Sequence, residues 1–286
     1  MKFGIIGTGV VGTALAVRLE MAGYECVGVN TRAEESYRLF RQYLNKEHFS
    51  LESLAPKADM LFITTQDGMI RQVAEELTSR ELLISGQLWI HCSGSLGSQV
   101  LRVAEDAPVK CLSIHPLQSF AGVPEAINLI KGTHFGIEGE AVEIAERLVR
   151  DLGGIPHRLK TADKTAYHAG AVVASNYLVV LAALAVQLFA QAGIDSKDAL
   201  HSLLPLMKGT VHNLEEVGIP QALTGPIARG DSAVVRGHLQ QLLPQQAALY
   251  RLLGKKALEL GQAKWQQAGL VYPEEALNEL KDLLSG

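Results

Sequence analysis

The feature that most constrains the fold is a glycine-rich turn near the start of the chain, Gly7-Thr8-Gly9-Val10-Val11-Gly12. It follows the apolar run KFGII and precedes a helical pattern, so it joins a strand to a helix as the pattern G-x-G-x-x-G requires. The first glycine permits a tight turn, the second lets a pyrophosphate approach the backbone, and the third lets the helix pack closely on the strand. The N–H groups at the helix N-terminus then face the phosphates. The turn therefore predicts a dinucleotide-binding site.

Short β-rich runs alternate with helical patterns through the first half of the chain. After a helix over residues 10–22, the order is ECVGVN, a helix over 33–44, MLFITT, and a helix that opens near Asp67. Further strand candidates are LWIHC, VKCLSIH and GTHFGI, followed by a helix over 141–152 and by GIPHRL. Such alternation is typical of βαβ units on a mostly parallel, doubly wound sheet. We therefore predict an α/β domain over residues 1–159.

Beyond residue 159 the β signal stops, and an all-α domain is expected over residues 160–286. Its first element is one long helical pattern over Thr161–Ala192. Within it, Ala169–Ala190 is about long enough to span a bilayer. Because this stretch carries polar residues, and because a helix that is apolar all round is buried somewhere, we expect a core or interface helix. The remaining helices should be shorter, interrupted at Gly193, Gly209, Pro220, Gly225-Pro226 and Pro244.

The composition fits two packed domains, because 286 residues with 48% hydrophobic and 20% charged residues are typical of globular proteins. The net charge of −4 includes no clustered basic excess, so no nucleic-acid partner is expected. The three cysteines form no CxxC pair, which argues against disulfides and a metal site and favours a reducing cytoplasm. An apolar strand directly after Met1 leaves no room for a signal peptide, so we expect no export.

The end of the second strand indicates which dinucleotide the site prefers. NAD-binding domains place an acidic residue there to bind the ribose hydroxyls, whereas this chain has Asn30, Thr31 and Arg32. The neutral asparagine does not repel a 2′-phosphate, and the threonine and arginine can bind one. We therefore predict NADP(H) rather than NAD(H). The alternative for Arg32 is a solvated charge at the start of the next helix.

Thr64 and Thr65 follow the strand MLFI, at the carboxyl edge where open α/β sheets bind ligands. We expect both residues to contact the cofactor. Asp67 opens the next helix, and we expect its side chain to be a helix N-cap.

Five segments, taken in order, resemble one bacterial family. They are GIIGTGVVG, IHCSGSL at 90–96, SIHPLQSF at 113–120, residues 164–176, and residues 223–231. The family joins a Rossmann-like domain to a C-terminal helical domain classed as a domain of unknown function, DUF2520. The chain is more distantly similar to pyrroline-carboxylate reductases, β-hydroxyacid dehydrogenases and ketopantoate reductases.

The resemblance implies a Rossmann domain followed by a helical dimerisation domain of the 6-phosphogluconate dehydrogenase C-terminal type, hence a homodimer. It also implies a cleft between the domains and a role as a ketopantoate reductase. In β-hydroxyacid dehydrogenases the matching helix carries Lys-x-x-x-Asn, with the lysine as proton donor. This chain has Lys164 and His168 instead, which leaves the proton source open between them.

The residues themselves support a site on the long helix. Lys164 and His168 are one turn apart, and Ser175 falls near the same face, giving a polar stripe on an apolar helix. Asn176 lies further round, and both Ser175 and Asn176 are candidates for substrate binding. A buried lysine needs a partner, which an anionic substrate would provide. The alternative is an exposed Lys164 and a packed core histidine.

Further candidates lie at the carboxyl ends of what we expect to be the fifth and sixth strands. His91 and Ser93, with Ser95 nearby, could contact the nicotinamide carboxamide or the substrate. His115-Pro116 resembles the His-Pro pair of prephenate dehydrogenases, and His115 is a third candidate for acid–base chemistry. Packing without a function is the alternative for both histidines.

In the helical half, Arg229 could bind a substrate carboxylate with its two-pronged guanidinium. Equally, Asp231 could cap the next helix and Arg229 could pair with it.

These observations predict a cytoplasmic NADP-dependent oxidoreductase that transfers hydride from NADPH to a small keto acid, with ketopantoate as the specific candidate. The alternatives are a protein that senses NADP(H) without turnover, a prephenate or imine dehydrogenase, and a scaffold.

Overall fold

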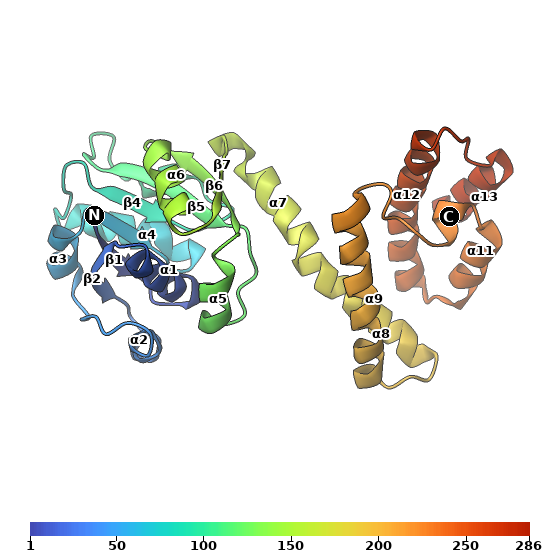
Figure 1. The fold of residues 1–286 in the computed structure, drawn as a ribbon, viewed down its shortest axis with the longest axis horizontal. Coiled ribbons are helices and arrows are strands. Elements are labelled where there is room, and N and C mark those ends of the chain that lie inside the picture. Colours follow the sequence, from blue (N-terminus) through green and yellow to red (C-terminus); the bar gives the residue numbers. More distant parts are fainter. The chain divides into compact units, whose positions relative to one another are not determined.

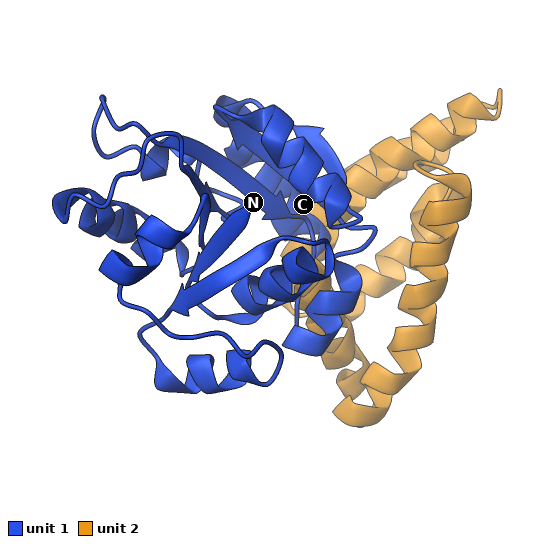
Figure 2. Cartoon of the chain, turned by 60° about the vertical axis from the view of Figure 1, so that its left-hand side comes forward, with its two compact units in different colours: residues 1–177 blue, residues 178–286 orange.

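The computed structural model describes all residues from 1 to 286, and these form two compact units, Met1–Tyr177 and Leu178–Gly286 (Figure 2). The first unit is α/β and the second is helical, as the sequence predicts. The first unit includes a helix beyond residue 159, whose side chains form hydrogen bonds with the sheet. The domain boundary at residue 159 stays a prediction.

The first unit is built on a seven-stranded sheet with the strand order β2-β1-β3-β4-β5-β6-β7. Neighbouring strands are parallel except for the pair β5 and β6, so the predicted mostly parallel, doubly wound sheet is confirmed. The order reverses at β1, and a ligand crevice is expected at such a point. The strands are β1 (Lys2–Ile6), β2 (Glu25–Asn30), β3 (Met60–Ile63), β4 (Leu88–His91), β5 (Lys110–Pro116), β6 (His134–Gly139) and β7 (Ile155–Arg158).

Four predicted helices of this unit are present: α1 (Val10–Met21), α2 (Glu34–Arg41), α4 (Asp67–Ser79) and α6 (Val142–Asp151) (Figure 1). We expected His91 and His115 at the ends of the fifth and sixth strands, and this numbering is wrong, because only α4 and a turn lie between β3 and the run LWIH. LWIH and KCLSIHP are therefore the fourth and fifth strands. The short elements without a sequence prediction are α3 (Leu51–Leu54), η1 (Ala55–Lys57), η2 (Ser98–Leu101) and α5 (Val123–Leu129), whereas η3 (Thr161–Asp163) begins the predicted long helical pattern.

Two apolar cores cover the two faces of the sheet, because alternate strand residues point to opposite sides. Phe3 and Ile5 of β1 pack with α1, α5 and α6 on one face. Ile6, with Leu61 and Ile63 of β3, packs with α3 and α4 on the other face. Strands that are buried on both faces read as continuous apolar runs, which is why MLFI and LWIH were recognisable.

The long helical pattern forms α7 (Lys164–Ala174) and α8 (Asn176–Gln191), interrupted at Ser175 with φ −111° and ψ −68°. Thr161–Gln191 is the one helical stretch that is long and apolar enough to cross a membrane. The prediction of a core helix is wrong for the single chain, because none of the residues of α8 is buried. The interface helix stays a prediction.

The second unit continues with α9 (Ser196–Val217), α10 (Pro226–Arg229), α11 (Ser232–Gln241), α12 (Pro244–Gln267) and α13 (Glu274–Ser285). Pro226 and Pro244 occupy first helical positions, where the missing N–H costs nothing. The expected interruption at Gly209 is wrong, because α9 runs through it. The apolar core of this unit is formed by Ile227, Val235, Leu258, Tyr272, Leu280 and Leu284.

The fit of α1 on the sheet predicts opposite outcomes for two glycines of the same turn. A Cβ on Gly12 would collide with the carbonyl oxygen of Gly7 and the hydroxyl of Thr64, so Gly12→Ala should lower the free energy of unfolding by roughly 1–3 kcal/mol. A Cβ on Gly9 would meet nothing within 4 Å, so Gly9→Ala is the matched control, with an expected change below about 0.5 kcal/mol. Urea unfolding followed by circular dichroism measures both. Equal stability of the two variants would contradict the packing argument.

Candidate functional site

A cleft of about 340 Å³ opens at the carboxyl ends of β1, β2 and β3. It brings together eight of the residues predicted to bind the cofactor, drawn from three separate turns: Gly7, Thr8, Gly9, Asn30, Thr31, Arg32, Thr64 and Thr65. Val10, Val11 and Gly12 begin α1 directly behind this lining. The cleft also has lining residues without a sequence prediction: Ile6, Ala33, Ser36, Leu51, Gln66, Met69, Val73 and Glu76.

The glycine-rich turn has the shape that its pattern requires. Gly7 has φ +100°, a conformation that favours glycine, and a Cβ there would lie 2.9 Å from the backbone of Thr64 and Thr65. Gly9 is the N-cap of α1, and the space where its Cβ would stand is open. A ligand can therefore approach the backbone closely at the positive end of the α1 dipole.

Two hydroxyls of the cleft lack partners. Thr8 Oγ1 and Thr65 Oγ1 are buried and form no hydrogen bond, although buried polar groups normally do. In contrast, Thr64 Oγ1 is used within the fold, because it donates to the carbonyl of Gly7 at 2.7 Å. The open glycine backbone and the two free hydroxyls fit an anionic ligand rich in acceptor oxygens, such as a pyrophosphate.

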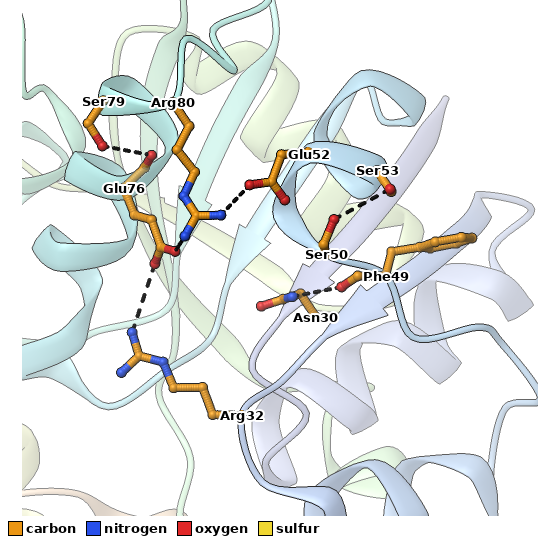
Figure 3. Close-up of polar contacts among 9 residues, drawn as sticks. All are labelled: Asn30, Arg32, Phe49, Ser50, Glu52, Ser53, Glu76, Ser79 and Arg80. Atoms are coloured by element: carbon orange, nitrogen blue, oxygen red, sulfur yellow. Dashed lines mark hydrogen bonds and ion pairs between the residues drawn. The ribbon is translucent and has the colours of Figure 1, made fainter.

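At the β2 end of the cleft, the Asn30 amide donates to the carbonyl of Phe49 at 2.7 Å (Figure 3). This bond fixes a neutral side chain where an acid would stand in an NAD-binding domain. Arg32 is 72% exposed, and its Nη2 lies 3.9 Å from Glu76 Oε2. Arg32 thus lines the cleft, and its ion pair with Glu76 is long and exposed.

A second group of polar side chains surrounds Gly94, in the loop after β4. A Cβ on Gly94 would lie 2.6 Å from His168 Nδ1 and 2.8 Å from His115 Nε2. The two imidazoles come from α7 and β5, and their ring centroids are 6.2 Å apart. His168 Nδ1 is buried without a hydrogen-bond partner. Two of the three predicted catalytic residues therefore face one small loop.

Tyr167 fixes the orientation of His115, since its hydroxyl lies 3.1 Å from His115 Nδ1. Burial, assisted by the charge of Lys164, lowers the pKa of His115 to about 4. The ring is therefore neutral at pH 7. If the tyrosine donates to Nδ1, the single ring proton sits on Nε2, which faces Gly94.

Lys164 is 1% exposed, so the alternative of an exposed lysine is wrong. Its ammonium donates to the carbonyl of Ser93 at 3.0 Å and to the hydroxyl of Ser113. Burial lowers the pKa of Lys164, and the negative charge of Glu138 opposes this effect. The buried Glu138 carboxylate also accepts hydrogen bonds from Ser98 and Thr161, which fastens the segment before α7 to the sheet.

The loop after β4 is connected to the start of α4 through Asp67. The prediction of Asp67 as an N-cap is wrong, because Gln66 is the N-cap and Asp67 is the first residue of α4. Its Oδ2 instead accepts hydrogen bonds from Ser93 at 2.7 Å and from Ser95 at 3.0 Å. This network links the rim of the cleft to the two residues that flank Gly94.

His91 is fully buried at the end of β4, and its Nδ1 accepts the N–H of Ser93 at 3.1 Å. The ring proton is therefore on Nε2, which is buried and has no partner. Burial lowers the pKa of His91 to about 4, so the ring is neutral. Neither His91 nor Ser93 lines the cleft.

Three other candidates are outside both groups. Ser175 and Asn176 are exposed, and their side chains form no hydrogen bond. Arg229 is exposed in the second unit without an ion pair, so the expected pairing with Asp231 is not formed. The prediction that Asp231 caps the next helix is confirmed, because its side chain accepts the N–H of Val234 at the start of α11.

Some of the residues without a prediction left a signal in the sequence. Met69, Val73 and Glu76 follow one another at spacings of four and three residues, so they share one face of α4. This spacing, together with the position of α4 beside the crevice, identifies the three residues as lining residues. Tyr167 is next to His168, but nothing in the sequence indicates that its hydroxyl reaches His115.

The sequence and the fold both match known proteins. Residues 1–116 match the Rossmann-like domain, and residues 133–257 match the domain of unknown function DUF2520. No curated protein sequence matches the chain.

Solved structures resemble nearly the whole chain. A proposed NADP oxidoreductase from Bacteroides fragilis is 25% identical with a TM-score of 0.70, and the match covers 90% of this chain and 98% of that one. A Thermotoga maritima protein is also 25% identical, with a TM-score of 0.73 and coverage of 92% and 99%.

At 15% identity, the pyrroline carboxylate reductase of Plasmodium falciparum, solved with NADP bound, shares only the fold, with a TM-score of 0.56 and coverage of 100% and 96%. The chain belongs to the proteins that join a Rossmann-like domain to a DUF2520 domain, as its sequence motifs predicted.

Proposed function

We propose that this protein is a reductase that transfers hydride from NADPH to the carbonyl group of a small keto acid. One observation carries the proposal: a cleft suited to a dinucleotide is connected, within one unit, to a loop faced by two imidazole nitrogens. Gln66 lines the cleft, and the next residue, Asp67, holds both serines that flank Gly94. A binding site for the reductant and a source of protons thus share one edge of the sheet.

The choice of NADPH rests on the β2 end of the cleft. Arg32 is free to turn toward a phosphate, because it has only one ion pair, at 3.9 Å. Asn30 places no charge there. NADP is named for the Bacteroides fragilis and Plasmodium falciparum proteins, which is consistent with this choice. When bound, NADPH supplies the hydride.

The chain must supply a proton to the carbonyl oxygen that becomes an alkoxide. We assign this role to His168, whose Nδ1 has no partner within the protein. His115, neutral and held by Tyr167, would donate a hydrogen bond from Nε2 to the same oxygen. Lys164 is a positioning residue in this scheme, since its ammonium is already bonded to Ser93 and Ser113.

Ketopantoate is our specific candidate among small keto acids, on the basis of the resemblance to ketopantoate reductases. Ser175, Asn176 and Arg229 stay predictions for substrate binding. Consumption of NADPH with ketopantoate, prephenate, pyrroline-carboxylate and short α-keto and β-keto acids tests the class of substrate. Tight NADPH binding without turnover of any of them would favour a sensor.

The apolar helix α8 supports a homodimer. Leu178, Val179 and Val180 are 40%, 69% and 53% exposed in the single chain. A row of large apolar side chains in water is unfavourable, and obligate interfaces resemble a core cut in half. We propose that a second copy of the chain covers α8.

The cofactor assignment predicts a selective effect of Arg32→Ala. Loss of hydrogen bonds to a charged phosphate should weaken NADPH binding by roughly 1.5–3 kcal/mol, about ten- to a hundredfold. NADH lacks the phosphate, so its dissociation constant should change little. Fluorescence titration with both cofactors measures this difference. Equal losses for the two cofactors would rule out the assignment.

The proton-donor assignment predicts that His168→Ala lowers kcat about 10²–10⁴-fold, with NADPH affinity unchanged. Lys164→Met should lower kcat less and should also destabilise the fold, because it leaves buried acceptors unpaired. His157→Ala, at an exposed histidine of β7, is the control. A loss of only a few-fold in His168→Ala would move the proton donor to Lys164 or His115.

The dimer proposal predicts a mass of twice 30.8 kDa by light scattering. Val179→Glu should shift the protein toward the monomer, because a charge would be buried in the interface. Met21→Glu is the control, at a residue of α1 that is 68% exposed. A monomeric wild-type protein at micromolar concentration would overturn the proposal.

A further inference from the structure

Four charged side chains alternate in sign at the β2 end of the cleft: Arg32, Glu76, Arg80 and Glu52 (Figure 3). Glu76 stands between the two arginines, with its Oε2 3.9 Å from Arg32 Nη2 and its Oε1 2.5 Å from Arg80 Nη2. The other terminal nitrogen of Arg80 binds Glu52 at the start of α3. Only Arg32 and Glu76 line the cleft.

The carboxylate of Glu76 creates a conflict for a cleft that binds NADPH. It shares the cleft wall with Arg32, which is our candidate ligand for the 2′-phosphate. An uncompensated carboxylate there would repel the phosphate, and it would accept hydrogen bonds from the free ribose hydroxyls of NADH. Glu76 alone would therefore favour the unphosphorylated cofactor.

Arg80 relieves this conflict without entering the cleft. Arg80 forms a short ion pair with Glu76, one helical turn earlier, and so compensates the negative charge of the carboxylate from outside the cleft. Glu52 keeps its negative charge, because hydrogen bonds from its own backbone, from Ser50 and from Arg80 lower its pKa. Arg80 is thus held between two carboxylates, and its guanidinium is fixed next to Glu76.

The pair between Arg32 and Glu76 is weak enough to exchange. Its side chains are 72% and 32% exposed and 3.9 Å apart, and exposed ion pairs contribute little. A phosphate offers Arg32 a two-pronged, charge-assisted contact, which is stronger. The guanidinium can leave Glu76 for a phosphate, while Glu76 stays with Arg80.

We propose that Glu76 and Arg80 set the preference of this cleft for a phosphorylated over an unphosphorylated dinucleotide. Arg80 is a positioning residue that acts through Glu76. The proposal rests on the proposed function, in which the cleft binds NADPH.

The test measures dissociation constants for NADPH and NADH in a double-mutant cycle. Arg80→Gln should weaken NADPH binding about three- to fivefold and leave NADH within about twofold, because it frees the negative charge of Glu76. Glu76→Gln alone should shift the preference further toward NADPH. In the double variant, the effect of Arg80→Gln should disappear, because the charge through which Arg80 acts is gone.

Arg71→Gln is the matched control, since it breaks an i to i+4 pair with Glu75 on the same helix, at 2.9 Å. It should leave both dissociation constants unchanged. The inference fails if Arg80→Gln weakens both cofactors equally, or if the double variant keeps the loss. If Arg80→Gln does not fold, an unchanged cofactor preference in Glu76→Gln also overturns it. A wild-type protein that binds neither cofactor would instead refute the proposed function.

Discussion

The buried ammonium of Lys164 holds the candidate site together. It joins the first residue of α7 to the loop after β4 and to the middle of β5, three segments that are far apart in the sequence. Taking a lysine out of water is unfavourable unless its donors are satisfied, so the arrangement of these segments is tightly specified. One helical turn later, His168 faces Gly94 as a consequence. The position of His168 thus depends on a charge that binds the same loop at the neighbouring residue, Ser93.

The two parts of the site use charge differently. The cleft near Arg32 has exposed pairs that cost little to rearrange, as a surface that exchanges ligands requires. Around Gly94 the imidazoles are half-buried, and the ring of His115 is fixed by the hydroxyl of Tyr167. A fixed set of dipoles is suited to stabilising charge that develops during a reaction, because it does not have to reorganise.

The sequence predicts the sheet and the glycine-rich turn well because both depend on local rules. Apolar runs such as MLFI must be strands that are buried on both faces, and three glycines at this spacing directly after an apolar strand identify the turn. The roles of Asp67 and Tyr167 depend instead on which loop reaches them, and their spacing in the sequence carries no information about that. Glu76 was missed because an acid on a helix is ordinarily a solvated charge. Likewise, the apolar pattern of α8 cannot distinguish a core helix from an interface helix.

The neutral histidines His91 and His115 also make folding sensitive to protons. His91 and His115 have pKa values of about 4 in the folded protein, whereas an unfolded histidine titrates near its ordinary value of about 6.5. Between these values the unfolded chain binds more protons than the folded one, so acid favours unfolding. The stability that these rings contribute is complete above about pH 6.5, and it is lost as the pH falls toward 4. The burial and the nearby charge of Lys164 that keep the rings neutral therefore couple the integrity of the site to the acidity of its surroundings.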